Sequence, residues 1–447
     1  MRSPWQLVLK SLRINNMQPG FKKYLINTGW VFGEKGLRLV SGLFIGAYVA
    51  RYLGPARYGL LGYAISLVTF CSAIAGLGLD QILVRELTRY PDKKTSILGT
   101  GFVLKFTAAL LVVALLMLTS KYAGSLETAM ILCIIGGGLL FESFGVIDFY
   151  FQAKVSSRYS VWGQMISLSV ISIIRVYLVL SKASLIWFAG TYALDYVLVA
   201  MGFLFFYTRN QFSIFKWNYS AALAKEFLKS SWPMIFASLS VAVYMKIDQI
   251  LIKWMLGDVA TGQYGVAVRL CELWYFVPVA ICASVFPAIL NAKAISEELY
   301  LARLQKLYDL MVAISVAIAI PMTFLSGWIV RILFGEAFAP AADVLNLYIW
   351  SGIFVFLGVA NGKWLISENQ QFFVMASLVT ACVLNIVLNL ILIPVIGLRG
   401  SALATLIAYS FASYFSWLFT KKTRPMFRYF TRSLYLPGLI KRNIRSK

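Results

Sequence analysis

Twelve runs of mostly apolar residues alternate with short polar segments along this chain. A helix needs ~20 mostly apolar residues to cross the hydrocarbon core of a bilayer. The runs occupy most of the sequence, so the pattern predicts an all-α integral membrane protein with twelve transmembrane helices. They lie near residues 27–50, 60–79, 97–118, 128–151, 161–180, 185–207, 231–256, 262–290, 309–334, 341–366, 372–394 and 401–420.

The loops between these runs differ in positive charge from one side to the other. The side that holds both termini carries roughly four times as many Lys and Arg as the opposite side, which places both termini in the cytoplasm. The expected organisation is a basic cytoplasmic arm (1–26), an N-terminal six-helix bundle (27–207), a cytoplasmic linker (208–230), a C-terminal six-helix bundle (231–420) and a basic cytoplasmic tail (421–447).

Two loops at equivalent places share a motif. Leu53-Gly-Pro-Ala-Arg-Tyr-Gly follows the first run, and Leu256-Gly-Asp-Val-Ala-Thr-Gly-Gln-Tyr-Gly follows the seventh, 203 residues later. Six crossings in each half return the chain to the same side. The repeat therefore predicts two bundles related by a pseudo-two-fold axis along the membrane normal.

Composition excludes several classes of protein. Hydrophobic residues make up 60% of the chain and charged residues 13%, which is incompatible with a soluble enzyme. The formal charge of +23 fits cytoplasmic loops and a tail lying against anionic lipid, so no nucleic-acid partner is expected.

Catalytic and metal motifs are missing from the sequence. The chain has no histidine, and its five cysteines lie singly in apolar runs. Gly358-Val-Ala-Asn-Gly-Lys-Trp falls short of a nucleotide-binding loop, because its spacing is short and Trp replaces the required Ser or Thr. We therefore expect a transporter rather than an enzyme, with no cofactor and with coupling to H⁺ or Na⁺ as an open possibility.

Charged residues inside the spans are the candidate site. A charge at the centre of a span costs at least ~2.5 kcal/mol and usually faces a cavity or a partner. Basic residues outnumber acidic ones in the twelve runs, so we expect a positively charged interior. The residues of interest are Glu34, Lys35 and Arg38 in the first run, Lys246 and Asp248 in the seventh, Arg269 and Glu272 in the eighth, and Lys363 in the tenth, with Asp80 at the end of the second.

Three segments resemble a known family. They are Tyr52-Leu-Gly-Pro-Ala-Arg-Tyr-Gly, Gly76-Leu-Gly-Leu-Asp-Gln-Ile-Leu-Val-Arg-Glu-Leu, and Lys246-Ile-Asp-Gln-Ile-Leu together with Gly262-Gln-Tyr-Gly-Val-Ala-Val-Arg-Leu. With the span count, they resemble the polysaccharide or O-antigen flippases (Wzx-type) of the multidrug/oligosaccharidyl-lipid/polysaccharide exporter superfamily.

The resemblance implies a function and a site. It implies a bacterial inner-membrane protein that moves an undecaprenyl-diphosphate-linked oligosaccharide to the periplasmic leaflet by alternating access, for O-antigen (lipopolysaccharide), capsule or exopolysaccharide synthesis. A polysaccharide polymerase and a chain-length regulator are the implied partners. Spans one, two, seven and eight would line a cationic cavity. That makes Arg38, Lys246 and Arg269 the leading substrate-binding candidates, followed by Lys35 and Lys363, with Glu34, Asp80, Asp248 and Glu272 as coupling or charge partners.

Other functions remain open on this fold. A peptidoglycan lipid precursor flippase and a cation-coupled multidrug exporter share it. A structural partner of a synthase would also have apolar spans, but it would tolerate neutralisation of Arg38 and Arg269.

Overall fold

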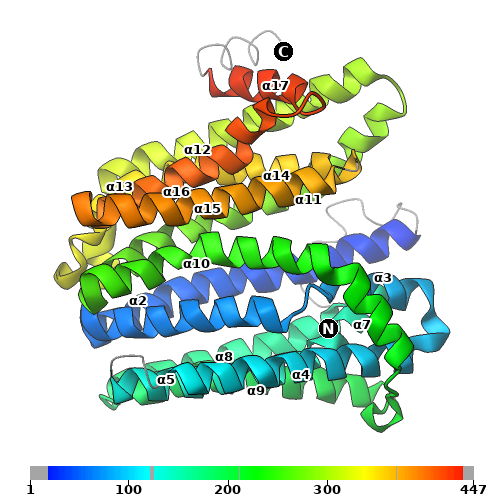
Figure 1. The fold of residues 1–447 in the computed structure, drawn as a ribbon, viewed down its shortest axis with the longest axis horizontal. Coiled ribbons are helices and arrows are strands. Elements are labelled where there is room, and N and C mark those ends of the chain that lie inside the picture. Colours follow the sequence, from blue (N-terminus) through cyan, green and yellow to red (C-terminus); the bar gives the residue numbers. More distant parts are fainter. Residues whose placement is uncertain (1–18, 121–124, 211, 369, 436–447) are drawn as a thin grey trace, which may run out of the picture.

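The computed structural model describes residues 19–120, 125–210, 212–368 and 370–435, and these residues are almost entirely helical. Figure 1 shows the long helices side by side along one common direction. The α-helices are α2 (Pro19–Ala75), α3 (Asp80–Arg89), α4 (Lys94–Ser120), α5 (Leu126–Gly137), α6 (Leu139–Glu142), α7 (Val146–Ala153), α8 (Arg158–Leu180), α9 (Leu185–Arg209), α10 (Ala221–Glu272), α11 (Phe276–Lys293), α12 (Glu297–Phe334), α13 (Ala341–Tyr348), α14 (Ser351–Ser367), α15 (Gln371–Ile396), α16 (Leu398–Ser413) and α17 (Arg424–Leu434).

The fold is that of an all-α, multi-pass membrane protein. Within the described residues, eight helical runs are long and apolar enough to cross a membrane, or nine if the bent pair α13 and α14 forms one crossing. Two of these runs are 63 and 73 residues long, which is too long for one straight crossing.

Glycines fold α2 and α10 back on themselves. Gly54 in α2 has φ 71° and ψ 170°, and Gly257 in α10 has φ 85° and ψ −173°. Only glycine adopts such angles at little cost. Each helix is thereby divided into a first limb before its glycine (19–53 in α2, 221–256 in α10) and a second limb after it (55–75 in α2, 258–272 in α10). Figure 1 shows the two limbs of each helix antiparallel and joined at the end of the molecule away from the N-terminus of α2. The two glycines are 203 residues apart, so the sequence repeat recurs as the same backbone turn.

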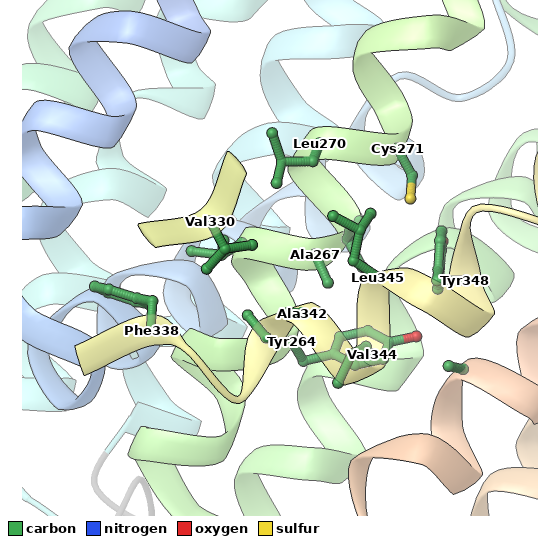
Figure 2. Close-up of a cluster of buried hydrophobic side chains, with 14 of the residues drawn as sticks. Tyr264, Ala267, Leu270, Cys271, Val330, Phe338, Ala342, Val344, Leu345 and Tyr348 are labelled. Atoms are coloured by element: carbon green, nitrogen blue, oxygen red, sulfur yellow. The ribbon is translucent and has the colours of Figure 1, made fainter. Parts of the chain in front are cut away.

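Each half has its own apolar core. In the C-terminal half, the second limb of α10 packs against α12 and α13 through Tyr264, Leu270, Val330, Leu345 and Tyr348 (Figure 2). A separate cluster in the N-terminal half joins α2, α4, α5, α8 and α9. Helices α2 and α10 also pack extensively on each other, so these two helices form the centre of the molecule.

Two boundaries differ from expectation. Helix α10 begins at Ala221, inside the expected linker 208–230, because Ser220 caps its first turn by accepting a hydrogen bond from the amide of Leu223. The ninth span also begins earlier than expected, because α12 starts at Glu297 rather than near residue 309 and no Gly or Pro interrupts the segment between them. The outer parts of the expected basic arm and tail, residues 1–18 and 436–447, lie outside the described residues.

Candidate functional site

Arg269 crosses from the second half of the chain into the first. Its Nη2 donates to the backbone carbonyl of Gly42, and its Nη1 lies 3.5 Å from the Tyr58 hydroxyl. A Cβ atom on Gly46 would lie 2.6 Å from Cζ of Arg269, so only glycine leaves room for the guanidinium. The Gly42-x-x-x-Gly46 pair of α2 therefore forms a slot for this side chain.

Lys246 and Arg269 line one small cavity between α2 and α10, of about 110 Å³. Lys246 Nζ lies 3.0 Å from Glu272 Oε1. Ser66 donates to Gln249 Oε1 at 2.7 Å, which makes a second polar contact between the two halves. The cavity thus collects two cations and one carboxylate at the centre of the molecule.

A larger cavity of about 590 Å³ opens beside this one, and Lys246 lines both. It lies between the second limb of α2, the helices α3, α4 and α6, and the first limb of α10. Asp80 and Lys105 line it and form an ion pair at 2.8 Å. Asp80 therefore has Lys105 as its partner, and Lys246 has Glu272.

Arg38 and Glu34 face a third cavity, of about 450 Å³, in the N-terminal half. The two side chains pair at 2.7 Å, and Arg38 also lies 3.8 Å from Asp195. Lys35 lines the same cavity and is exposed. Lys363 lies on α14, but its side chain is outside the described residues.

The expected positive excess is wrong for these three cavities. Their walls carry five cationic and six carboxylate side chains. Two further basic residues of the apolar runs line none of these cavities: Lys253 pairs with Asp258, and Arg175 stacks over Tyr192. Position within an apolar run did not reveal which charges share a cavity. The cations are Lys35, Arg38, Lys105, Lys246 and Arg269, and the carboxylates are Glu34, Asp80, Glu142, Asp148, Asp195 and Glu272.

Asp248 occupies a different environment. Its side chain is buried in the C-terminal half, and its carboxylate accepts hydrogen bonds from Tyr264 at 2.6 Å, Asn389 at 2.8 Å and Thr405. These donors come from α10, α15 and α16. Asp248 is thus held by neutral donors rather than by a cation.

Several oxygens near Asp248 lack partners. Among the described residues, the side-chain oxygens of Asn385, Asn389 and Ser401 are buried and make no hydrogen bond. Leaving a buried polar atom unpaired costs about 1–3 kcal/mol, so native proteins rarely do so without a reason. A carboxylate surrounded by unpaired neutral oxygens is a chemically suitable site for a hard monovalent cation.

Sequence reasoning missed Tyr58, Ser66, Tyr192 and Gln249 at the central cavity. None carries a charge, so the search for intramembrane charges passed over them. The repeat did contain a signal, because Ser66 and Arg269 are 203 residues apart.

Comparisons with known proteins agree with this architecture. The sequence model of the family described as "Polysaccharide biosynthesis protein" matches residues 25–293. The probable flippase AglR of Haloferax volcanii is 24% identical over 425 residues, covering 86% of this chain and 80% of AglR. The fold of the present chain resembles that of the lipid II flippase MurJ in an inward closed conformation (TM-score 0.73, 16% identity, 95% of this chain and 93% of that chain covered). It also resembles an inward-facing multidrug resistance MATE family transporter (TM-score 0.68, 12% identity, 88% and 95% covered).

Proposed function

The chain belongs to the polysaccharide biosynthesis protein family, and we propose that it is a flippase that carries a lipid-linked glycan across a membrane. AglR, a relative of this chain, is named a probable flippase. The chain itself has the fold of a lipid II flippase. The proposed substrate is an undecaprenyl-diphosphate-linked oligosaccharide. The proposed location is a bacterial inner membrane with both termini cytoplasmic, in the synthesis of O-antigen, capsule or exopolysaccharide. A polymerase and a chain-length regulator would receive the product.

The observation that carries the proposal is the setting of Arg269. Its hydrogen bonds go to a carbonyl and a hydroxyl, both neutral, so its positive charge is available to an anion. A phosphate offers stronger, charge-assisted bonds than either, and a guanidinium can hold it through two parallel N–H groups. Lys246 on the same cavity supplies a second positive charge. The pair suits the diphosphate of a lipid carrier, whose isoprenoid tail would stay in the lipid.

The fold supports alternating access. Counting the two limbs of α2 and of α10 separately, with α11 continuing the second limb of α10, and adding α13–α14 and α16 as crossings, gives the proposed twelve spans in two bundles. The two halves meet along α2 and α10, where the cavities lie. Rocking of the halves about this contact would expose the central cations to one side and then to the other.

Energy would come from a cation bound at Asp248. No nucleotide-binding loop is present in the sequence, so an ion gradient is the remaining strong drive. A proton on Asp248 would need only one acceptor, whereas a metal ion needs several oxygens. The unpaired oxygens of Asn385, Asn389 and Ser401 therefore favour Na⁺ over H⁺.

The test is a translocation assay with purified protein in liposomes. Arg269→Ala should abolish movement of a fluorescent polyprenyl-diphosphate-linked oligosaccharide, and an inward Na⁺ gradient should accelerate the parent protein. A matched control is Arg57→Ala, because Arg57 lies in α2 just after the Gly54 turn and lines none of the three central cavities. Equal rates for Arg269→Ala and the parent would overturn the substrate site. Equal binding of lipid II and of the oligosaccharide carrier would favour the peptidoglycan precursor alternative.

One observation favours a second function. Five carboxylates line the 450 Å³ cavity of the N-terminal half, and such a cavity can attract an organic cation. Cation-coupled drug export is therefore the second candidate. Resistance to cationic dyes on overexpression, lost in Asp195→Asn but retained in Arg269→Ala, would support it over glycan transport.

A further inference from the structure

A fourth cavity, of about 260 Å³, lies inside the C-terminal half and has no charged side chain among its described lining residues. It is enclosed by the first limb of α10, by α14, α15 and α16, and by the short 3₁₀ turn Phe415–Leu418. Its polar and aromatic wall consists of Tyr244, Asn361, Ser377, Tyr409, Ser413 and Trp417. None of these residues belongs to the central cavities described above.

Two polar side chains in the wall of this cavity, Asn361 and Ser377, present acceptors to it. Asn361 is 2% exposed, and its amide nitrogen already donates to the Ser413 carbonyl at 2.8 Å. Its side-chain oxygen has no hydrogen-bond partner among the described residues. The Ser377 hydroxyl donates to the Val374 carbonyl at 2.9 Å, which leaves its lone pairs to the cavity. Oxygen lone pairs in an aromatic wall suit a cation.

This cavity lies one helical turn from Asp248. Tyr244 precedes Asp248 by four residues on α10, and Tyr409 follows Thr405 by four on α16, so each pair is separated by about 6 Å along its helix. The two tyrosine rings meet edge to face, with centroids 5.0 Å apart. They therefore close the cavity on the side of the Asp248 cluster.

We propose that this cavity is the vestibule through which the coupling cation reaches Asp248, with the Tyr244–Tyr409 pair as the constriction between them. The inference rests on the cation coupling proposed above. An ion in the cavity would meet the Asn361 oxygen and would then pass the aromatic edges to reach Asp248. The ring pair slows passage without taking part in the final coordination.

Gly362 provides a way to fill the vestibule. It lines the cavity, and a Cβ built on it would meet no atom within 4 Å. A leucine there would start from an open position and extend its larger side chain into the cavity. Gly327 on α12 is equally open and lines none of the four cavities, so Gly327→Leu is the matched control.

The test follows release of bound ²²Na⁺ from the purified full-length protein by rapid filtration, together with equilibrium binding. Gly362→Leu should slow both binding and release at least ten-fold and leave the equilibrium dissociation constant within two-fold of the parent. Tyr409→Ala should accelerate both rates, and Tyr409→Phe should behave as the parent, because a phenylalanine ring still closes the gap. Gly327→Leu should change nothing.

The outcomes separate the route from the site. Unchanged rates in Gly362→Leu and Tyr409→Ala, with Na⁺ binding abolished in Asp248→Asn, would overturn the vestibule and leave the coupling site standing. Retained ²²Na⁺ binding in Asp248→Asn, or no binding by the parent, would overturn the coupling site and the route with it. A fall in equilibrium affinity with unchanged rates of binding would place the cavity at the site itself and overturn its role as a passage.

Discussion

Gly59 and Gly262 lie against each other where the two halves of the molecule meet. A Cβ on Gly59 would lie 2.6 Å from the amide nitrogen of Gly262 and would overlap the carbonyl of Asp258. A Cβ on Gly262 would lie 3.2 Å from the amide nitrogen of Gly59 and would overlap the carbonyl of Pro55. Gly262 follows Gly59 by 203 residues, and Asp258 follows Pro55 by the same number. The contact is therefore reciprocal, as at an interface between two equal subunits.

The same spacing relates two polar contacts deeper in the molecule. Ser66 bonds to Gln249, and Arg269 lies in the slot beside Gly46. Gln249 lies 203 residues after Gly46, and Arg269 lies 203 residues after Ser66, so the two pairs occupy equivalent positions of the repeat. Each contact is thus the counterpart of the other, but the second half carries the larger side chain in both. The cation of Arg269 therefore lies at this contact because the two repeats differ at these positions.

Alanine at Gly59 or Gly262 should open this end of the molecule. The added methyl group meets backbone atoms, which cannot rotate away as a side chain would, and such overpacking typically costs 1–3 kcal/mol. We expect the closed state to lose about ten-fold or more in population relative to the state in which the halves are apart. Cysteines at Pro55 and Asp258 should then cross-link more slowly than in the parent background.

Gly137→Ala is the control for this prediction, because a Cβ there meets nothing within 4 Å. Equal cross-linking rates in Gly59→Ala, Gly262→Ala and the control would show that the glycine contact does not set the closed state.

The sequence predicted the class of fold and the position of the repeat. Apolar runs reveal helices because the bilayer imposes length and composition on each crossing. The two Leu-Gly motifs predicted equivalent turns, and Gly54 and Gly257 adopt nearly the same backbone angles. Arg269 and Lys246 were both expected at one cavity, and both line it.

The charge balance of the site could not be predicted in the same way. Whether Lys105 pairs with Asp80, or Lys246 with Glu272, depends on how separate helices rotate against each other, and apolar runs in a membrane carry little information on rotation. The neutral residues Ser66 and Gln249 gave no signal of their own. The unpaired oxygens around Asp248 appear only once three helices are assembled.

Alanine at Gly46 should disable the site without weakening the fold. Its methyl group would meet the end of the Arg269 side chain, which is flexible and can move. We expect the guanidinium to leave its slot and translocation to fall about ten-fold, with the melting temperature within about 2 °C of the parent. Gly29→Ala on the same helix meets open space and should retain full activity. Full activity in Gly46→Ala would show that the slot is not needed to position Arg269.

Neutralising the two partners of the Lys246–Glu272 pair should act in opposite directions. Glu272→Gln leaves the Lys246 ammonium without its carboxylate, so it should tighten binding of inorganic pyrophosphate several-fold. Lys246→Met removes a positive charge from the cavity and should weaken binding about ten-fold, or ~1.4 kcal/mol. Isothermal titration of the purified protein with pyrophosphate measures both. A shift of the same sign in both variants would mean that the pair is structural and does not face the anion.

Alanine at Asn385 should separate ion binding from folding. The Asn385 side chain is buried and has no hydrogen bond of normal geometry among the described residues, so its loss should cost the ion-free protein little stability. We expect the melting temperature without Na⁺ to be unchanged or higher. With Na⁺ the parent should gain about 2.7 kcal/mol at a hundred times its dissociation constant, and a ten-fold weaker site would gain about half of that. Asn346→Ala, which also removes an unpaired buried side-chain oxygen but on α13, should keep the full Na⁺-dependent gain. If Asn385→Ala kept it as well, the oxygens around Asp248 would not be ligands.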